Sequence, residues 1–110
     1  MTLSAGARFR SAMKQKNDNN QPLQIAGAIN AYTAMMATQV GHQALYLSGA
    51  GVANASFGLP DLGMTSLDNV LEDARRITDA VETPRLVDID TGFGGACNIA
   101  HTIKKMAKAG

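Results

Sequence analysis

Two aspartates, Asp88 and Asp90, are separated by a single residue where the apolar run Leu86 to Ile89 ends. Side chains two apart in a strand point to the same face, so we expect both carboxylates to share a face with Leu86. Two adjacent carboxylates repel unless a cation lies between them, and Mg²⁺ is commonly held by one or two carboxylates plus water and substrate oxygens. The pair therefore predicts a divalent metal site for Mg²⁺, with Mn²⁺ as an alternative. A plainer interpretation is that one aspartate caps the turn at Gly92 and the other is solvated.

A second candidate site is the run Ser48, Gly49 and Ala50, which follows the short apolar segment Ala44 to Leu47. A serine hydroxyl and the backbone amides of small residues are donors suited to a substrate carboxylate. A plain turn of small residues explains the same segment equally well, and the sequence leaves both interpretations open.

The glycines of this segment also suggest a weaker alternative, a dinucleotide-binding loop. That loop needs a helix N-terminus directly after its glycines, whereas the run Gly58 to Gly63 predicts no regular helix before Thr65. Within this run, Asp61 is expected to approach the pocket of the candidate metal and carboxylate sites through metal-bound water. An aspartate after proline is also a common turn residue.

No residue of the chain is predicted to be catalytic. Cys97 lies near the start of the last predicted helix and is interpreted as a small buried residue rather than a nucleophile. His42 and His101 have no partner at metal-ligand spacing, so we expect them to be structural or surface residues. A single cysteine cannot form an internal disulfide, which favours a reducing, cytoplasmic compartment.

The elements that must position these residues alternate regularly along the chain. Residues 1–22 are expected to form an N-terminal helix, Met1 to Lys16, followed by a polar linker. Residues 23–110 then divide into three strand–helix units, with strands at 23–29, 44–47 and 86–89 and helices at 31–40, from 65 or 66 onward, and 96–109. Asn30 is the expected N-cap of the first of these helices, and Gly41 is expected to end it. A long loop, 48–63, interrupts the second unit.

The helix that begins after Thr65 or Ser66 has the clearest periodicity. Its apolar residues recur three and four apart, which places Leu67, Val70, Leu71, Ala74 and Ile77 on one buried face. Its charged residues, Asp73 among them, are expected on the other faces.

Successive strand–helix units predict an α/β fold with parallel strands joined by crossover helices. A complete (β/α)8 barrel needs about 250 residues. The 110-residue chain therefore fits a partial (β/α)8 TIM barrel, consisting of a leading helix and the first three βα units.

The composition narrows the classes of partner. The chain is 45% hydrophobic and 17% charged with a net charge of +1, which is ordinary for a globular protein and offers no basic surface for nucleic acid or anionic lipid. No apolar run approaches the roughly 18 residues of a membrane-spanning helix. We therefore expect neither nucleic acid nor membrane as a partner.

Three segments together, Leu45 to Ala53, Gly58 to Gly63 and Leu86 to Gly95, resemble the methylisocitrate lyases of the isocitrate lyase and phosphoenolpyruvate mutase superfamily. The resemblance runs from about Leu23 to Gly110 and implies a TIM barrel that cleaves 2-methylisocitrate, a hydroxy tricarboxylate, to pyruvate and succinate in the methylcitrate cycle of propionate catabolism. It also implies Mg²⁺ dependence and a homotetramer.

The resemblance assigns the same residues as the local chemistry does. Ser48, Gly49 and Ala50 would contact a substrate carboxylate, Asp88 and Asp90 would hold the metal, and Asp61 would lie beside them. The family's catalytic cysteine belongs to a segment beyond Gly110, which implies that the isolated chain is inactive. The alternative is a truncated, non-catalytic interaction module or remnant.

Overall fold

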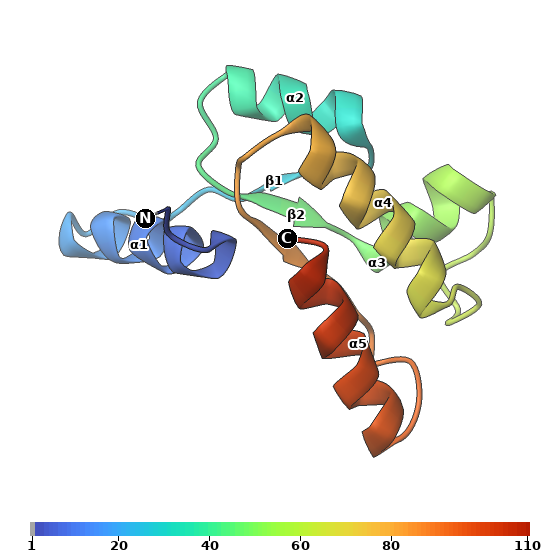
Figure 1. Cartoon of the computed structure of the whole chain (residues 1–110). Helices are drawn as coiled ribbons and strands as arrows, with labels where there is room; N and C mark the ends of the chain where they lie inside the picture. The colour runs from blue at the N-terminus through green and yellow to red at the C-terminus, as the bar shows by residue number, and fades with distance from the viewer. Residues whose placement is uncertain (1) are drawn as a thin grey trace.

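The computed structural model describes residues 2–110 as helices arranged around three short parallel strands (Figure 1). In chain order the elements are α1 (Ala5–Asp18), β1 (Ala26–Gly27), α2 (Ala31–Gln39), β2 (Leu45–Leu47), α3 (Gly49–Gly51), the π-helical turn η1 (Val52–Ser56), α4 (Leu67–Ala80), β3 (Arg85–Val87) and α5 (Ala96–Lys108). None of these helices is long and apolar enough to cross a membrane.

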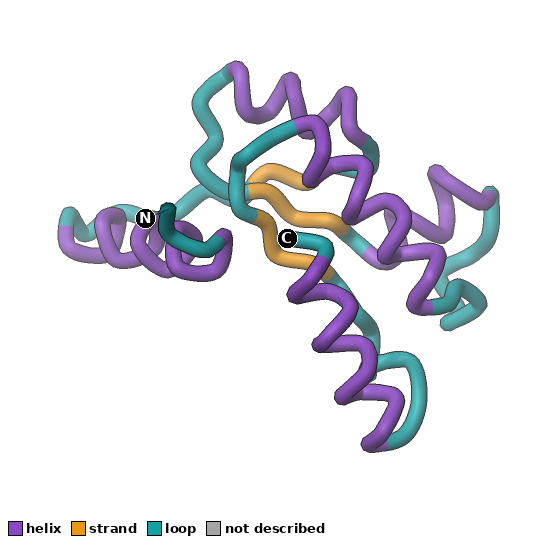
Figure 2. The backbone as a smooth tube through the Cα atoms, viewed as in Figure 1, coloured by secondary structure: helices purple, strands orange, loops and turns teal. Residues whose placement is uncertain are grey.

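The strands form one parallel sheet in the order β1-β2-β3. Leu45 pairs with Ala26 on one side and with Arg85 on the other, and Leu47 pairs with Val87. Figure 2 shows the three strands side by side between the helices. Parallel neighbours require a crossover between them, which α2 and α4 supply. The α/β class and the three βα units of a partial barrel are therefore confirmed.

The core lies between one face of the sheet and the helices α2 and α4. Its largest fully buried apolar side chains are Leu45, Leu47, Val52, Val70 and Ile77. The other face of the sheet is open, since Leu86 remains 51% exposed. The two faces differ because successive strand residues alternate in direction.

Local capping signals set the helix ends. The side chain of Asn30 accepts a hydrogen bond from the backbone N of Thr33 at 2.8 Å and caps α2. Gly41, with φ 102°, follows the end of α2 in the left-handed region that glycine adopts readily. Ser66 and Asn69 form a reciprocal capping box at the start of α4. The predictions for Asn30, Gly41 and Ser66 are confirmed.

Several predicted boundaries are wrong. Helix α1 continues past Lys16 to Asp18, and β1 contains two residues instead of the whole run 23–29. The segment 48–63 is not a continuous loop, because α3 and η1 occupy residues 49–56. The Ser48 side chain accepts from the backbone N of Gly51 at 3.2 Å, and Val52 and Ala53 are buried, so capping and burial stabilise a helix before Thr65.

Asp73 also departs from expectation, because it is buried with only 4% of its surface exposed. Its carboxylate accepts from the Ser56 hydroxyl at 2.6 Å and from the Arg76 guanidinium at 3.2 Å. Buried charges are tolerated where hydrogen bonds replace water. Asp73 therefore fastens η1 to α4.

Candidate functional site

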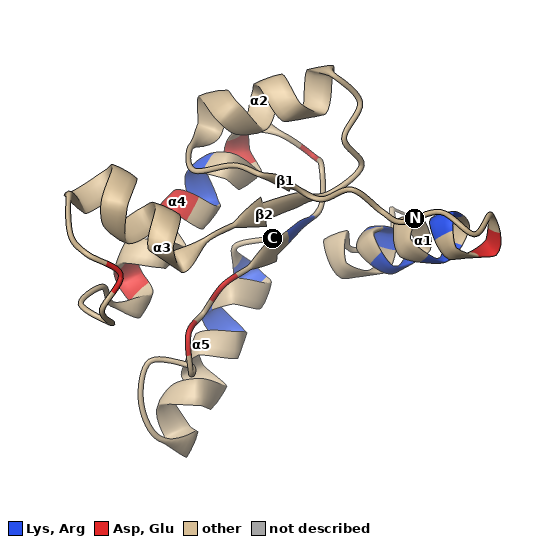
Figure 3. Cartoon of the chain, turned by 180° about the vertical axis from the view of Figure 1, so that it is seen from behind, with Lys and Arg blue, Asp and Glu red and all other residues tan. Residues whose placement is uncertain are grey.

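The candidate site lies where β2 and β3 end. Parallel strands bring their carboxyl ends to one edge of the sheet, so Ser48 after β2 and Asp88 after β3 become neighbours. The backbone N of Asp88 donates to the carbonyl of Leu47 at 2.9 Å, which extends the ladder one residue beyond β3. Figure 3 shows acidic positions along the segment that leads from β3 toward α5.

The carboxylate of Asp88 is held by the segment after β2. Its Oδ2 accepts from the backbone N of Gly49 at 3.3 Å and from the hydroxyl of Tyr46 at 3.4 Å. A Cβ at position 49 would lie 3.1 Å from the same oxygen, so only glycine leaves the carboxylate in its place without displacement. Both hydrogen bonds are long, and a carboxylate offers about four lone-pair sites, so Asp88 keeps acceptor capacity for a cation.

Tyr46 is a neighbour of Asp88 that the sequence interpretation did not single out. Burial, followed by the negative charge of Asp88 and a hydrogen bond to it, raises the pKa of Tyr46 above its ordinary value of 10.0. The charge of Asp61 acts in the same direction, and the Ser48 side chain acts in the opposite one. The strand alternation was the available signal, since Leu45 and Leu47 are buried on the face opposite Tyr46. The structure thus places the Tyr46 hydroxyl within 3.4 Å of the Asp88 carboxylate.

Asp90 does not occupy the strand position that alternation predicts. Strand β3 ends at Val87, and Asp90 is exposed with φ 48°, in the left-handed region. Its backbone N donates to Oδ1 of Asp88 at 3.0 Å, and Gly92 closes the turn by donating to the carbonyl of Ile89 at 2.8 Å. Asp88 therefore caps this turn as the plainer interpretation expected, while its Oδ2 still faces Gly49.

The run Ser48 to Ala50 both caps a helix and contacts Asp88. The Ser48 hydroxyl oxygen caps α3, and the amide of Gly49 already donates to Asp88.

Asp61 is exposed in the turn that follows Pro60. No cluster of three or more His, Cys, Asp or Glu side chains able to hold a metal occurs within residues 2–110.

The remaining polar candidates lie outside this site. Cys97 is a free thiol and is exposed, so its interpretation as a buried residue is wrong. His101 is exposed on α5, and His42 is half-buried after α2.

Parallel strand–helix units with polar side chains at the carboxyl ends of neighbouring strands define the class of α/β enzymes whose sites form at that edge. Comparison with known proteins identifies the family. The sequence profile of phosphoenolpyruvate phosphomutase matches residues 9–110, and the chain belongs to that family. It spans about a third of the length of the curated relatives it matches.

Two relatives are similar over the whole chain. The 2-methylisocitrate lyase of Shewanella oneidensis is 66% identical over 110 residues, which are 100% of this chain and 36% of the relative. The 2-methylisocitrate lyase of Vibrio cholerae is 64% identical over 110 residues, which are 100% of this chain and 34% of the relative.

Solved structures give the same family. An oxaloacetate acetylhydrolase superposes with a TM-score of 0.85 at 26% identity, covering 96% of this chain and 37% of that one. A 2,3-dimethylmalate lyase of the phosphoenolpyruvate mutase and isocitrate lyase superfamily superposes with a TM-score of 0.80 at 28% identity, covering 98% of this chain and 38% of that one. A phosphonopyruvate hydrolase, solved in complex with oxalate and Mg²⁺, superposes with a TM-score of 0.81 at 30% identity, covering 98% of this chain and 36% of that one.

Proposed function

We propose that this chain carries the metal- and carboxylate-binding corner of a 2-methylisocitrate lyase. The whole protein would cleave 2-methylisocitrate to pyruvate and succinate in propionate catabolism. The observation that carries the proposal is the contact between Asp88 and Gly49, because it joins the predicted metal ligand to the predicted carboxylate-binding segment. The names of the relatives at 64% and 66% identity support the choice of reaction.

The residues at this corner fit Mg²⁺, with Mn²⁺ as an alternative. Mg²⁺ takes oxygen ligands and commonly uses one or two carboxylates, with water and substrate oxygens completing its shell. Asp88 and Asp90 would supply those carboxylates, and Asp61 would act through water. The Mg²⁺ and oxalate of the phosphonopyruvate hydrolase complex support this assignment. When bound, the metal supplies Lewis-acid stabilisation of negative charge on substrate oxygens.

The chain's own groups would orient the substrate. The Ser48 hydroxyl and the amides of Gly49 and Ala50 would donate hydrogen bonds to one substrate carboxylate. The Gly49 amide would then give up its hydrogen bond to Asp88 and donate to the substrate instead. Tyr46 keeps its proton to a higher pH than an ordinary tyrosine, so its hydroxyl remains a hydrogen-bond donor beside Asp88. No residue among these is proposed as the acid that completes the cleavage.

The same proposal covers partners and location. The substrate would be a hydroxy tricarboxylate, the whole protein would assemble as a homotetramer, and its metabolic role would place it in the cytoplasm.

The test begins with metal binding by the chain itself. We expect Mn²⁺ binding, measured by electron paramagnetic resonance and displaced by Mg²⁺, to be lost in Asp88→Asn and retained in Asp79→Asn, a change at an exposed site on α4. Equal binding by Asp88→Asn would contradict the metal assignment. A lyase assay on the whole protein with 2-methylisocitrate and Mg²⁺ then tests the reaction, and a lack of pyruvate formation would contradict it.

A further inference from the structure

One cavity at the amino ends of the strands, away from Asp88, is lined by two arginines that are far apart in the sequence. Arg8 comes from α1, and Arg85 is the first residue of β3. The cavity has a volume of about 210 Å³, and its walls are Ala5, Arg8, Thr78, Val81, Glu82, Arg85 and Gly110. Figure 3 shows basic positions on α1 and at β3.

No Asp or Glu side chain within residues 2–110 forms an ion pair with Arg85. Its guanidinium donates to the hydroxyl of Thr78 and to backbone oxygens of Ala109 and Gly110. Burial, and then the positive charge of Arg8, lower the pKa of Arg85 below its ordinary value. Two partly buried guanidinium groups near each other are costly unless an anion accompanies them.

Arg8 is only weakly neutralised. Its guanidinium donates to the carbonyl of Glu82, and the nearest carboxylate oxygen, also of Glu82, lies 3.9 Å away on a side chain that is 97% exposed. Its Nε is buried and has no hydrogen-bond partner among residues 2–110. Most of the five donors of this guanidinium are therefore free for another acceptor.

The start of α1 adds a third positive element. Ala5, the first residue of this 14-residue helix, lines the cavity, and the first turn contains no acidic residue. A helix N-terminus carries about half a positive charge and favours anions beside it.

We propose that Arg8 and Arg85, together with the N-terminus of α1, bind a small anion through its carboxylate or phosphate oxygens. Planar guanidinium groups match both kinds of anion with paired hydrogen bonds. The cavity volume limits the ligand to an anion such as inorganic phosphate or a short dicarboxylate. The site lies at the opposite end of the strands from Asp88, so it is separate from the proposed metal corner.

The direct test follows the Arg8 Nε–H signal by ¹⁵N nuclear magnetic resonance while inorganic phosphate, or in a second arm succinate, is added to the chain. We expect a saturable shift at Arg8 and Arg85 but none at Arg10, an exposed arginine on the same helix. A response to only one of the two anions identifies the ligand chemistry. Equal shifts at all three arginines, or no shift with either anion, would overturn the proposal.

Variants give an independent measurement of affinity. Arg8→Gln is expected to weaken the binding of the responding anion at least tenfold, and Arg10→Gln to leave it unchanged. Glu82→Gln removes the carboxylate that lies 3.9 Å from Arg8 and should tighten binding several-fold, so the proposal remains testable even if an arginine variant does not fold. Unchanged or weaker binding by Glu82→Gln would contradict it.

Discussion

The backbone N of Gly49 donates to Oδ2 of Asp88 at 3.3 Å, which joins the first residue after Ser48 to the first carboxylate after β3. The two residues are 39 positions apart in the chain and meet because β2 and β3 are parallel neighbours. Their contact makes the position of the Asp88 carboxylate depend on the size of residue 49.

The first prediction concerns Gly49→Ala. The added Cβ would lie 3.1 Å from Oδ2 and 3.3 Å from Cγ of Asp88, so the carboxylate must move by a few tenths of an ångström. Overpacking of this kind costs about 1–3 kcal/mol, and the same free energy lost from metal binding would lower the affinity by about fivefold to about 150-fold. We expect Mn²⁺ affinity to fall accordingly. Gly27→Ala is the matched control, because a Cβ there meets no atom of the described residues within 4 Å. Equal affinity in both variants would show that Asp88 is not a ligand.

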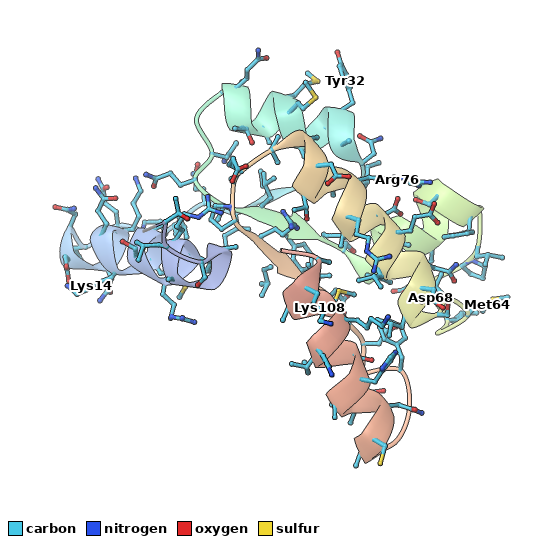
Figure 4. All side chains as sticks on the ribbon, in the orientation of Figure 1. Lys14, Tyr32, Met64, Asp68, Arg76 and Lys108 are labelled. Atoms are coloured by element: carbon cyan, nitrogen blue, oxygen red, sulfur yellow. The ribbon has the colours of Figure 1, made fainter. Side chains whose placement is uncertain are left out.

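The second prediction is the titration of Tyr46. Tyr46 and Tyr32 are the two tyrosines of the chain, and Tyr32 is 70% exposed on the outer surface of α2 (Figure 4). In a Tyr32→Phe background, tyrosinate absorbance therefore reports Tyr46 alone. We expect its pKa to lie above 10.0, and Asp88→Asn to lower it only partly, because burial is the larger cause and the Asp88 charge the second.

The same group makes stability depend on alkaline pH. A pKa that is higher in the folded than in the unfolded chain gives a contribution that is fully present below the unfolded value and is lost as pH rises through the folded value. The free energy of unfolding should therefore fall above pH 10.0 more steeply in the Tyr32→Phe chain than in the chain that also carries Tyr46→Phe. Parallel slopes, measured by urea unfolding, would contradict this assignment.

Short-range signals explain which parts of the fold could be predicted. The caps at Asn30 and Ser66 depend on residues three positions away, and Gly41 depends on its own backbone freedom, so the sequence is sufficient for α2 and α4. The helical turns at 49–56 depend on the burial of Val52 and on the Ser56–Asp73 bond across 17 positions. Neither is visible to local periodicity, and the predicted loop was wrong for that reason.

The site was predictable to the extent that strand order and alternation determine it. Asp88 and Ser48 follow neighbouring parallel strands, which the strand–helix pattern indicates. Asp90 follows the strand in a turn with positive φ, where alternation no longer applies. Tyr46 alternates with two buried leucines and could have been assigned to the site face from that pattern alone.

The third prediction tests the attachment of η1 to α4. Asp73→Ala removes the acceptor of the Ser56 hydroxyl and should lower the free energy of unfolding by about 1–3 kcal/mol. It should also increase amide hydrogen exchange selectively in residues 52–56. Asp79→Ala, at an exposed position near the end of the same helix, should be neutral or slightly stabilising, because negative charge is unfavourable at a helix C-terminus. Uniform exchange changes along the chain would refute a local role for Asp73.

The fourth prediction concerns the turn that carries Asp90. The buried Thr102 hydroxyl on α5 donates to the carbonyl of Gly92 at 2.9 Å and ties this turn to the helix that follows it. Thr102→Val keeps a similar shape but leaves the carbonyl unpaired, which should cost about 1–3 kcal/mol in urea unfolding. Thr102→Ser keeps the hydroxyl and should be the milder change, since it deletes one methyl group at a cost of about 1 kcal/mol. If Asp90 contributes to metal binding, Mn²⁺ affinity should fall in Thr102→Val and recover in Thr102→Ser. A loss of stability in Thr102→Val without any change in affinity would leave Asp88 as a metal ligand and remove Asp90 from that role.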